Sequence, residues 1–496
     1  MLTTLAAPAF ADIWHIENGD ITISAGESGN NVTQNNNTTY GDTNTIITNQ
    51  NKDKASSHTV TIETNDKNDK VEVTLKDVNI DTSSRNKAAV SVTGSGNTTI
   101  KLDGDNALKS DIYRSGIYGS GSLTISGGEN DSLTAQGGSG ANGISSSGSL
   151  TISGGTVTAN GDDGGRGISS SGSVTISGGS TVTANGGSGT ISGGDGIWSG
   201  GVVTISGGST VTANGGNGGS LVGGDGIRSG GGLTVSDGTV TAKGGNGDSK
   251  DGYGGDGIRS GGVVTISGNT VNAAGGYGGK VGGYGICSFD RVAISGGTVE
   301  AAGGNGSTGG GSGIYSSVID LSGSLELTAK AGSPNGKALS QNGSELVLDT
   351  IKDKLGPGAK VTATDADGKV IDQVSTPRPV EPEESSSSSD GGSSAPSAPA
   401  SPLPGLTVTD KDGQRISYTS TQSGNTLTVC VGRLTASFRI SLAALRQLRA
   451  EGIETIAFQT VLCSTTLSVD ELLAMGGENA EAVLTHRFTD SSLTVG

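Results

Sequence analysis

Three aspartates stand at the same place in successive copies of one glycine-rich motif. The copies read GGDGIWSGG and twice GGDGIRSGG, and they carry Asp195, Asp225 and Asp256. Carboxylates stacked at one place in successive repeats repel one another, and a bound cation or a nearby arginine relieves that repulsion. Arg228 and Arg259 follow their own aspartates by three residues. Two alternatives therefore stand: a weak Ca²⁺ site at the three aspartates, or solvated turn aspartates with arginine partners.

A second column of candidate residues follows the isoleucine of each motif. Down the chain it reads Tyr118, Ser145, Ser169, Trp198, Arg228, Arg259, Cys287 and Tyr315. Flat rings stack on sugar faces, and arginine and aspartate form hydrogen bonds with hydroxyls. The candidate glycan-binding residues are Tyr118, Trp198, Arg228, Arg259 and Tyr315. The alternative is that these side chains merely tolerate solvent on an exposed sheet face.

Other chemistry of glycine-rich loops does not fit the repeats. A phosphate loop needs GxxxxGK[ST] between a strand and a helix, and the repeats contain no such run. The calcium-binding nonapeptide GGxGxDxUx has a different spacing and a shorter period. A β-helix lyase or glycosidase needs paired carboxylates, or a base beside a Ca²⁺-bound uronate. Short Gly/Ser repeats lack the long loops that build a catalytic cleft, so we expect no catalytic residues and no enzyme.

The histidines and cysteines give little information about function. The three histidines are isolated, which disfavours a histidine-based metal site or a Ser-His-Asp triad. Of three cysteines, Cys430 and Cys463 fall in two apolar strand-like runs. They could pair as a disulfide in an oxidising compartment or remain buried free thiols, because spacing does not settle geometry.

The elements that position these residues recur with a fixed period. The Gly-Ile starts at Gly116, 143, 167, 196, 226, 257, 285 and 313 lie 24–31 residues apart, which is a solenoid period. Each unit contains Gly-Ile-x-Ser, an alternating Val-Thr-Ile-Ser and a Thr-Val-Thr-Ala segment. Such short segments cannot bury themselves as hairpins, but stacked in parallel they share one core. The sequence therefore predicts a parallel β-helix in which the glycines of the GGDGI(W/R)SGG motif make a turn.

The apolar side chains of these segments are expected to form two inward columns. The first contains Ile117, Ile144, Ile168, Ile197, Ile227, Ile258, Ile286 and Ile314. The second contains Ile125, Ile152, Ile176, Ile205, Val235, Ile266, Ile294 and Leu321. Asn160, Asn185 and Asn214 recur after the third segment and are interpreted as a structural hydrogen-bonded ladder.

Composition shifts divide the chain into six parts. We expect a signal-peptide remnant at 1–11, irregular N-terminal coils with a cap at 12–115, regular repeats at 116–337, C-terminal coils at 338–374, a linker at 375–405 and a small α+β domain at 406–496. The linker holds seven of the ten prolines and a run of five serines. In the last domain, SLAALRQLRAEG predicts an amphipathic helix that ends at Gly452, and Ser468 with Glu471 forms a capping box.

Charge and the N-terminus bear on location and partners. A net charge of −17 argues against nucleic acid and anionic membrane surfaces. Ala9-Phe10-Ala11 has the form of a signal-peptidase site behind an apolar stretch, so we expect an extracellular or cell-surface protein. No run is long enough to span a bilayer, so we expect no membrane insertion.

The TISGGTVTANGG repeats, the alternating strands before them and the signal-like start resemble bacterial secreted parallel β-helix proteins described as carbohydrate-binding-domain-containing. The resemblance covers roughly residues 12–370 and brings no site residues with it. It implies an extracellular β-helix that associates with glycans. The leading hypothesis is a non-catalytic, adhesin-like glycan-interacting protein of a bacterial surface. The alternatives are a structural spacer that displays the C-terminal domain and a β-helix polysaccharide enzyme.

Overall fold

The chain divides into two compact units, residues 1–383 and 384–496. The computed structural model describes residues 12–377 and 405–495, with gaps at 410–414, 417, 424, 432–435, 461–463, 478–479 and 487–490. The expected signal remnant at 1–11, most of the 375–405 linker and Cys463 lie outside the described residues. In the described ranges, no helix is long and apolar enough to cross a membrane.

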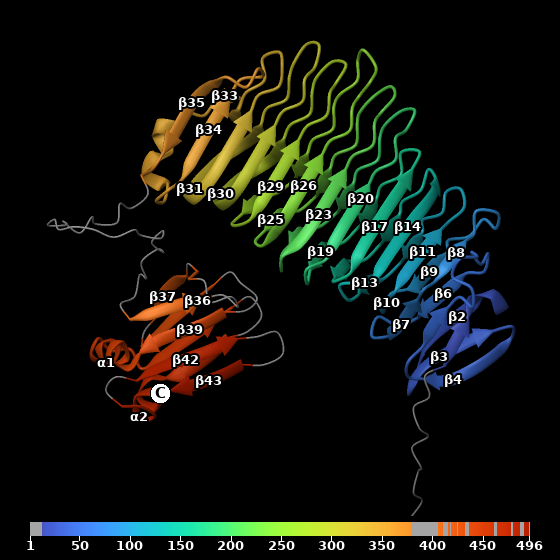
Figure 1. Ribbon diagram of the computed structural model, residues 1–496. Helices are drawn as coiled ribbons and strands as arrows, with labels where there is room; N and C mark the ends of the chain where they lie inside the picture. The colour runs from blue at the N-terminus through green and yellow to red at the C-terminus, as the bar shows by residue number, and fades with distance from the viewer. Residues whose placement is uncertain are drawn as a thin grey trace, which may run out of the picture. The chain divides into compact units, whose positions relative to one another are not determined.

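The first unit is the predicted parallel β-helix, with about 13 turns (Figure 1). Three columns of short strands stack turn upon turn. The first column consists of β2 (Ile21–Gly26), β6 (Val60–Thr64), β9 (Val90–Gly94), β12 (Ile117–Gly119), β15 (Ile144–Ser146), β18 (Ile168–Ser170), β21 (Ile197–Ser199), β24 (Ile227–Ser229), β27 (Ile258–Ser260), the starts of β30 (Ile286–Ala302) and β31 (Ile314–Lys330), and β32 (Leu339–Gln341).

The second column consists of β1 (Ile13–His15), β5 (Ile46–Thr48), β7 (Lys70–Lys76), β10 (Asn97–Asp103), β13 (Ser122–Ser126), β16 (Leu150–Ser153), β19 (Val174–Ser177), β22 (Val203–Ile205), β25 (Leu233–Val235), β28 (Val264–Ile266) and the middles of β30 and β31. The third consists of β8 (Asn79–Asp81), β11 (Asp105–Lys109), β14 (Ser132–Ser139), β17 (Thr156–Asp162), β20 (Thr181–Asn185), β23 (Ser209–Asn214), β26 (Gly238–Lys243), β29 (Thr270–Ala274), the ends of β30 and β31, and β34 (Lys360–Thr364).

Antiparallel strands close both ends of the stack. β3 (Gly29–Gln34) pairs with β2 and with β4 (Asn37–Asp42), and the 3-10 helix η1 (Ile16–Asn18) precedes them. At the other end, β33 (Ser344–Glu345) pairs with β32, η2 (Leu348–Lys354) follows, and β35 (Val370–Ser375) pairs with β34. Antiparallel partners cover strand edges that would otherwise remain open for pairing with another chain.

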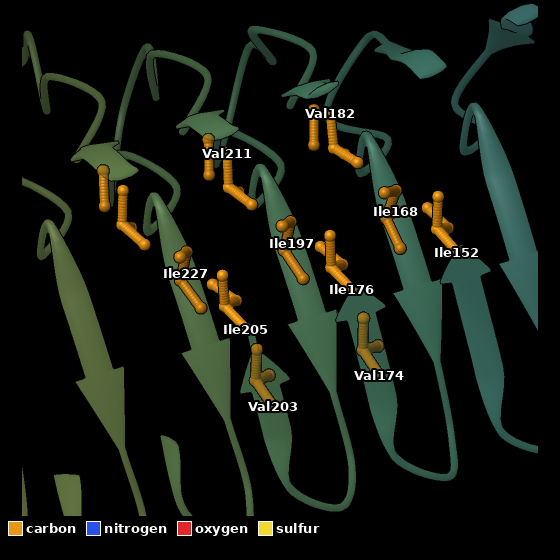
Figure 2. Packing of buried hydrophobic residues seen from close by; sticks show 14 of the residues in the cluster. Ile152, Ile168, Val174, Ile176, Val182, Ile197, Val203, Ile205, Val211 and Ile227 are labelled. Carbon is orange, nitrogen blue, oxygen red and sulfur yellow. The ribbon is translucent and has the colours of Figure 1, made fainter. Parts of the chain in front are cut away.

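The core of the first unit includes both inward columns predicted from the sequence, together with apolar side chains of the third strand column such as Val182 and Val211. Every residue of the two predicted columns is fully buried, and Figure 2 shows Ile168, Ile197 and Ile227 in line from turn to turn. Each fully buried isoleucine contributes about 1.5–3 kcal/mol of transfer free energy. The asparagine ladder is also confirmed: Asn185 Nδ2 donates to Asn160 Oδ1 at 2.8 Å, and Asn214 Nδ2 donates to Asn185 Oδ1 at 2.8 Å.

Glycine-rich loops connect the third column to the first column of the next turn, and they rise along one edge of the stack in Figure 1. Their backbones form hydrogen bonds that alternate between bonds within one loop and bonds between loops of neighbouring turns. Gly194 N donates to Gly187 O, Gly216 N to Gly194 O, and Gly224 N to Gly216 O, each at 2.8 Å. A Cβ added at Gly224 would lie 1.9 Å from Gly194 O, so only glycine permits this packing.

This layer corrects the expectation that the motif glycines simply make a turn. Gly193, Gly194, Gly223 and Gly224 do not have the left-handed φ typical of turn glycines. Their role is the close approach of one loop backbone to the next, which extends the stacked cross-section beyond the apolar core.

The second unit is the expected small α+β domain. An antiparallel sheet contains β36 (Leu406–Thr409), β39 (Ala436–Ser441), β42 (Glu481–His486) and β43 (Ser491–Val495). A second sheet contains β37 (Thr419–Ser423), β38 (Thr426–Cys430), β40 (Thr455–Gln459) and β41 (Ser464–Ser468), with β38 and β40 parallel. The helices are α1 (Leu442–Ala450) and α2 (Val469–Ala474).

Local signals in this domain behave as predicted. Gly452 follows α1 with a φ of 93°, and Ser468 Oγ accepts the Glu471 N–H at 3.4 Å. The Phe438 and Phe458 rings, one from each sheet, lie 5.0 Å apart in the core. Cys430 Sγ donates to Gln459 Oε1 at 3.2 Å. Since Cys463 is outside the described residues, the Cys430–Cys463 disulfide stays a prediction.

Candidate functional site

The residues that follow the inward isoleucines stack in one column, as the repeat predicted. The strand register pairs Trp198 with Arg228 and Arg228 with Arg259, while Tyr118 begins the column and Tyr315 continues it. Tyr118 and Arg228 are exposed, whereas Trp198, Arg259 and Tyr315 are half-buried. The column therefore offers rings and guanidinium groups to solvent on one face.

Cys287 departs from the expectation that this whole column faces outward. Its side chain is buried, because the short thiol lies in register between the longer Arg259 and Tyr315. The Tyr315 ring in turn stacks on Tyr284, with centroids 4.9 Å apart. Burial, together with the negative charge of Asp256, raises the pKa of the Cys287 thiol to about 12.

The three aspartates are not the solvated turn residues considered above. Asp195, Asp225 and Asp256 are only 4–6 % exposed. The glycine layer encloses them: a Cβ added at Gly186 or Gly244 would lie 2.9 or 3.0 Å from the carbonyl carbon of Asp195 or Asp256. The turn-forming glycines around the aspartates suggested that these side chains are exposed. Instead, loops of neighbouring turns pack over the aspartates and exclude solvent from them.

Each aspartate bonds to the next turn through one carboxylate oxygen. Asp195 Oδ1 accepts the N–H of Asp225 at 2.9 Å, and Asp225 Oδ1 accepts the N–H of Asp256 at 2.7 Å. Asp256 Oδ1 accepts the N–H of Tyr284 at 2.7 Å. The ladder is thus a structural link between turns, and it leaves one oxygen of each aspartate for other partners.

Two arginines take the second oxygen at the ends of the ladder. Arg259 Nη1 lies 3.1 Å from Asp256 Oδ2, as the three-residue spacing suggested. Asp195 Oδ2 accepts a hydrogen bond at 3.1 Å from Nε of Arg166, a residue of the preceding turn. Among the described residues, no carboxylate pairs with Arg228, which corrects its expected role as a neutraliser of Asp225.

Asp225 is therefore the unpaired member of the ladder. Among the described side chains, none donates a hydrogen bond to its Oδ2. Burial and the flanking charges of Asp256 and Asp195 raise its pKa well above the ordinary value. The pKa of Asp256 is also raised, chiefly by burial, although Arg259 opposes that shift.

These groups line a groove of about 840 Å³ between the glycine loops and the first strand column. Its charged side chains are the three aspartates with Arg166, Arg228 and Arg259. Its aromatic side chains are Tyr253 and Tyr284. We call this hollow the main groove. Three acids and three bases beside two tyrosine rings suit a neutral, hydroxyl-rich ligand.

Arginines and aromatic rings reinforce one another beside the main groove. The Arg166 guanidinium carbon lies 4.5 Å from the centre of the Trp198 ring, so Arg166 bridges Trp198 and Asp195. The Lys280 ammonium lies 5.6 Å from the centre of the Tyr253 ring. Such cation–π contacts hold exposed rings in fixed orientations.

The candidate sugar-binding residues do not all meet. Arg228 and Arg259 line the main groove, and Trp198 is linked to it through Arg166. Tyr118 instead lines a second hollow near the N-terminal turns. Tyr315 lines neither hollow, but it stacks on the groove residue Tyr284.

Three groove residues were missed at the sequence level, and two of them carried a readable signal. Arg166 and Tyr284 occupy the place immediately before Gly-Ile that the aspartates occupy in the intervening turns. The Arg166 N–H also donates to Asn142 Oδ1, just as the N–H groups of Asp225 and Asp256 each donate to Oδ1 of the preceding aspartate. Tyr253 lies in a loop of variable length, so the repeat alignment does not place it.

The surroundings of the three aspartates bear on metal binding. In the part of the chain that the structure describes, no three His, Cys, Asp or Glu side chains come together so as to hold a metal ion. Arginine already occupies the outer oxygens of Asp195 and Asp256. The Ca²⁺ hypothesis stays a prediction, and a thermal melt with and without EDTA tests it.

Comparison with known proteins identifies the repeat region. A family model described as "Carbohydrate-binding domain-containing protein" matches residues 54–311, which include both hollows and the aspartate ladder. No curated protein and no solved structure matches the chain. Because the matched segment covers more than half of the 496 residues, the chain belongs to the family of carbohydrate-binding domain-containing proteins.

Proposed function

We propose that this protein binds a glycan in the main groove and does not cleave it. The observation that carries the proposal is the groove itself, which places Arg228, Tyr253 and Tyr284 beside the buried aspartate ladder. Sugar sites combine ring faces with a few fixed polar groups, and this groove contains both. Family membership supports carbohydrate as the class of ligand.

The state of the aspartates supports a non-catalytic role. A glycosidase needs two carboxyl groups that are free to act as acid, base or nucleophile. Asp195 and Asp256 each use one oxygen for a backbone N–H and the other for an arginine. Among the three, only Asp225 keeps an oxygen without a described partner, so the ladder presents a single such carboxyl group to the groove.

The proposal places this activity outside the cell, at a bacterial surface, where the protein would act as an adhesin-like glycan binder. The support is the signal-like Ala9-Phe10-Ala11 pattern. Detection of the full chain in the culture medium or on intact cells by an antibody tests this location.

A glycan array tests the binding proposal. The test variant replaces Arg228 and Tyr253 with alanine, because neither side chain bonds to a buried aspartate. The matched control replaces Arg291 and Tyr40, both exposed and outside both hollows. We expect the wild type and the control to bind the same glycans and the test variant to lose them. Binding retained by the test variant would remove the main groove as the site.

A further inference from the structure

The motif GGDGIRSGG occurs twice in identical form, and its two copies differ in one contact. In the second copy, Arg259 Nη1 lies 3.1 Å from Asp256 Oδ2. In the first copy, Arg228 has the same position in the chain relative to Asp225, but among the residues that the structure describes it forms no ion pair. The strands of the two copies pair in register, Arg228 against Arg259. The difference therefore lies in the side chains and not in the geometry of the repeat.

The other two arginines of the main groove are each held by a carboxylate and an aromatic ring. Arg166 donates to Asp195 Oδ2 and lies over the Trp198 ring. Arg259, already paired with a carboxylate, also lies 5.1 Å from the centre of the Phe289 ring. The third arginine of the groove has neither kind of partner within the described ranges, and its side chain is exposed. It is therefore the groove arginine with the greatest freedom to move.

Asp225 offers the acceptor that Arg228 lacks. Its Oδ1 accepts the N–H of Asp256 at 2.7 Å, which fixes the carboxyl group, while its Oδ2 has no donor among the described side chains. Asp225 is only 6 % exposed and lines the same groove as Arg228. A buried carboxylate without a partner is costly, and a guanidinium within reach offsets that cost. An ionised Asp225 therefore attracts Arg228, whereas a neutral one does not.

The surroundings of Asp225 favour its neutral form. Asp195 and Asp256 flank it at the one-turn spacing of about 4.8 Å. Burial and these two charges raise the pKa of Asp225 well above its ordinary value. Burial also raises the pKa values of Tyr284 and Cys287, so both stay neutral while Asp225 titrates. The remaining charged or titratable side chains around this part of the groove are Arg166, Arg228, Tyr253 and Arg259.

We propose that Arg228 is a latch on the main groove: with Asp225 neutral it stays in the groove and is available to a ligand, and with Asp225 ionised it binds Oδ2 of that residue, as Arg259 binds Asp256. The ligand and Asp225 then compete for one guanidinium, so ligand binding weakens as the pH rises through the titration of Asp225. This control of binding rests on the proposed function, whereas the movement of Arg228 needs no ligand.

Labelling of arginines with phenylglyoxal in the full-length chain, without any ligand, tests the movement. Mass spectrometry gives the rate at Arg228 relative to exposed Arg291, which corrects for the general rise of arginine reactivity with pH. From mildly acidic to mildly alkaline pH, we expect this relative rate to fall about threefold or more, the effect of one partly exposed ion pair. It should approach the rate at Arg259, which is paired throughout.

Variants assign the change in labelling to Asp225. Asp225→Asn keeps the acceptor for the Asp256 N–H and removes the charge, so the relative rate at Arg228 should stay high at every pH. Exposed Asp251→Asn is the matched control and should follow the wild type. Circular dichroism spectra equal to that of the wild type would show that each variant is folded. A relative rate at Arg228 that is the same in the wild type and in Asp225→Asn over the whole range would overturn the latch.

Calorimetric titration with a glycan selected by the array measures the effect on the groove. We expect the dissociation constant of the wild type to rise about threefold or more over the same pH range, and that of Asp225→Asn to stay level. Binding that stays level in the wild type while the labelling changes would overturn the control of binding.

The latch and the proposed function can fail separately. A change in Arg228 labelling in a chain that binds no glycan at any pH would retain the latch and reject the proposed function. Glycan binding that is lost in Arg228→Ala/Tyr253→Ala, with Arg228 labelling that is equal in the wild type and in Asp225→Asn, would retain the proposed function and reject the latch.

Discussion

The backbone N–H of Asp256 donates a 2.7 Å hydrogen bond to Oδ1 of Asp225, a residue of the preceding turn. This bond orients the Asp225 carboxyl group, and Asp225 Oδ2 has no partner among the described side chains. Asp195 and Asp256 have the same backbone link but also an arginine. The ladder therefore holds one buried carboxyl group whose protonation depends on its neighbours.

The protein should become less stable as the pH rises, because the folded state favours the protonated form of Asp225. The folded state holds the Asp225 proton at pH values where the unfolded chain, with a pKa of about 3.9, has lost it. The free energy of unfolding therefore decreases as the pH rises from the unfolded pKa through the raised folded pKa. Asp225→Asn keeps the acceptor for Asp256 N–H and removes the charge, so it should become more stable than the wild type by about 1–3 kcal/mol at neutral pH.

Urea unfolding of both proteins between acid and neutral pH measures this difference. Exposed Asp251→Asn serves as the control and should follow the wild type at every pH. A constant difference between Asp225→Asn and the wild type over that range would show that Asp225 does not hold its proton in the folded state.

The glycine layer should not tolerate even one methyl group. Gly224→Ala places a Cβ 1.9 Å from Gly194 O, so loops of two turns must separate, and we expect a loss of about 3 kcal/mol or more. Gly119→Ala is the matched control, because its nearest contact would be an ordinary 3.7 Å. Thermal melts compare the two, and equal melting temperatures would contradict backbone packing as the reason for glycine.

Arg166 should stabilise the fold through Asp195. Arg166→Ala leaves a carboxylate with a 9 % exposed side chain without its cation, which should cost about 1–3 kcal/mol because Arg166 itself is partly exposed. Adding Asp195→Asn should recover most of that loss. Chemical unfolding of the two single variants and the double variant gives the coupling energy, and a coupling near zero would contradict the pair.

Cys287 should resist thiol reagents in the folded protein. With its pKa raised to about 12, chiefly by burial, its thiolate fraction near neutral pH is about a thousandfold below that of an ordinary cysteine. The test protein carries Cys430→Ser and Cys463→Ser, and the comparison adds Cys287→Ser with Ser145→Cys at a half-buried place in the same column. Similar labelling rates of the two proteins would contradict the burial of Cys287.

The sequence was sufficient to predict the strands and the core, since both follow from local periodicity. Ile197 and Ile227 recur in register, and the alternation of Val203 and Ile205 with Thr204 fixes which side chains face inward. The asparagine ladder was predictable for the same reason, because identical residues in register can bond to one another.

The burial of the aspartates was not predictable in this way. Asp225 stands between glycines that indicate a turn, and its exclusion from solvent results from loops of neighbouring turns that pack without side chains. Arg166 was missed because it replaces the aspartate of its own turn and pairs with Asp195 of the next. Tyr118 was assigned to a single strip, but the loop that carries Tyr113 and Arg114 places it in a separate hollow.

The most direct test of glycan binding in the main groove is calorimetric titration of the full chain with the strongest glycan from the array. Loss of the Arg228 and Tyr253 side chains removes a charged donor and a ring contact, so the dissociation constant of Arg228→Ala/Tyr253→Ala should rise about a hundredfold. The Arg291→Ala/Tyr40→Ala control should keep the wild-type value. Equal dissociation constants for the wild type and the main-groove variant would contradict the account.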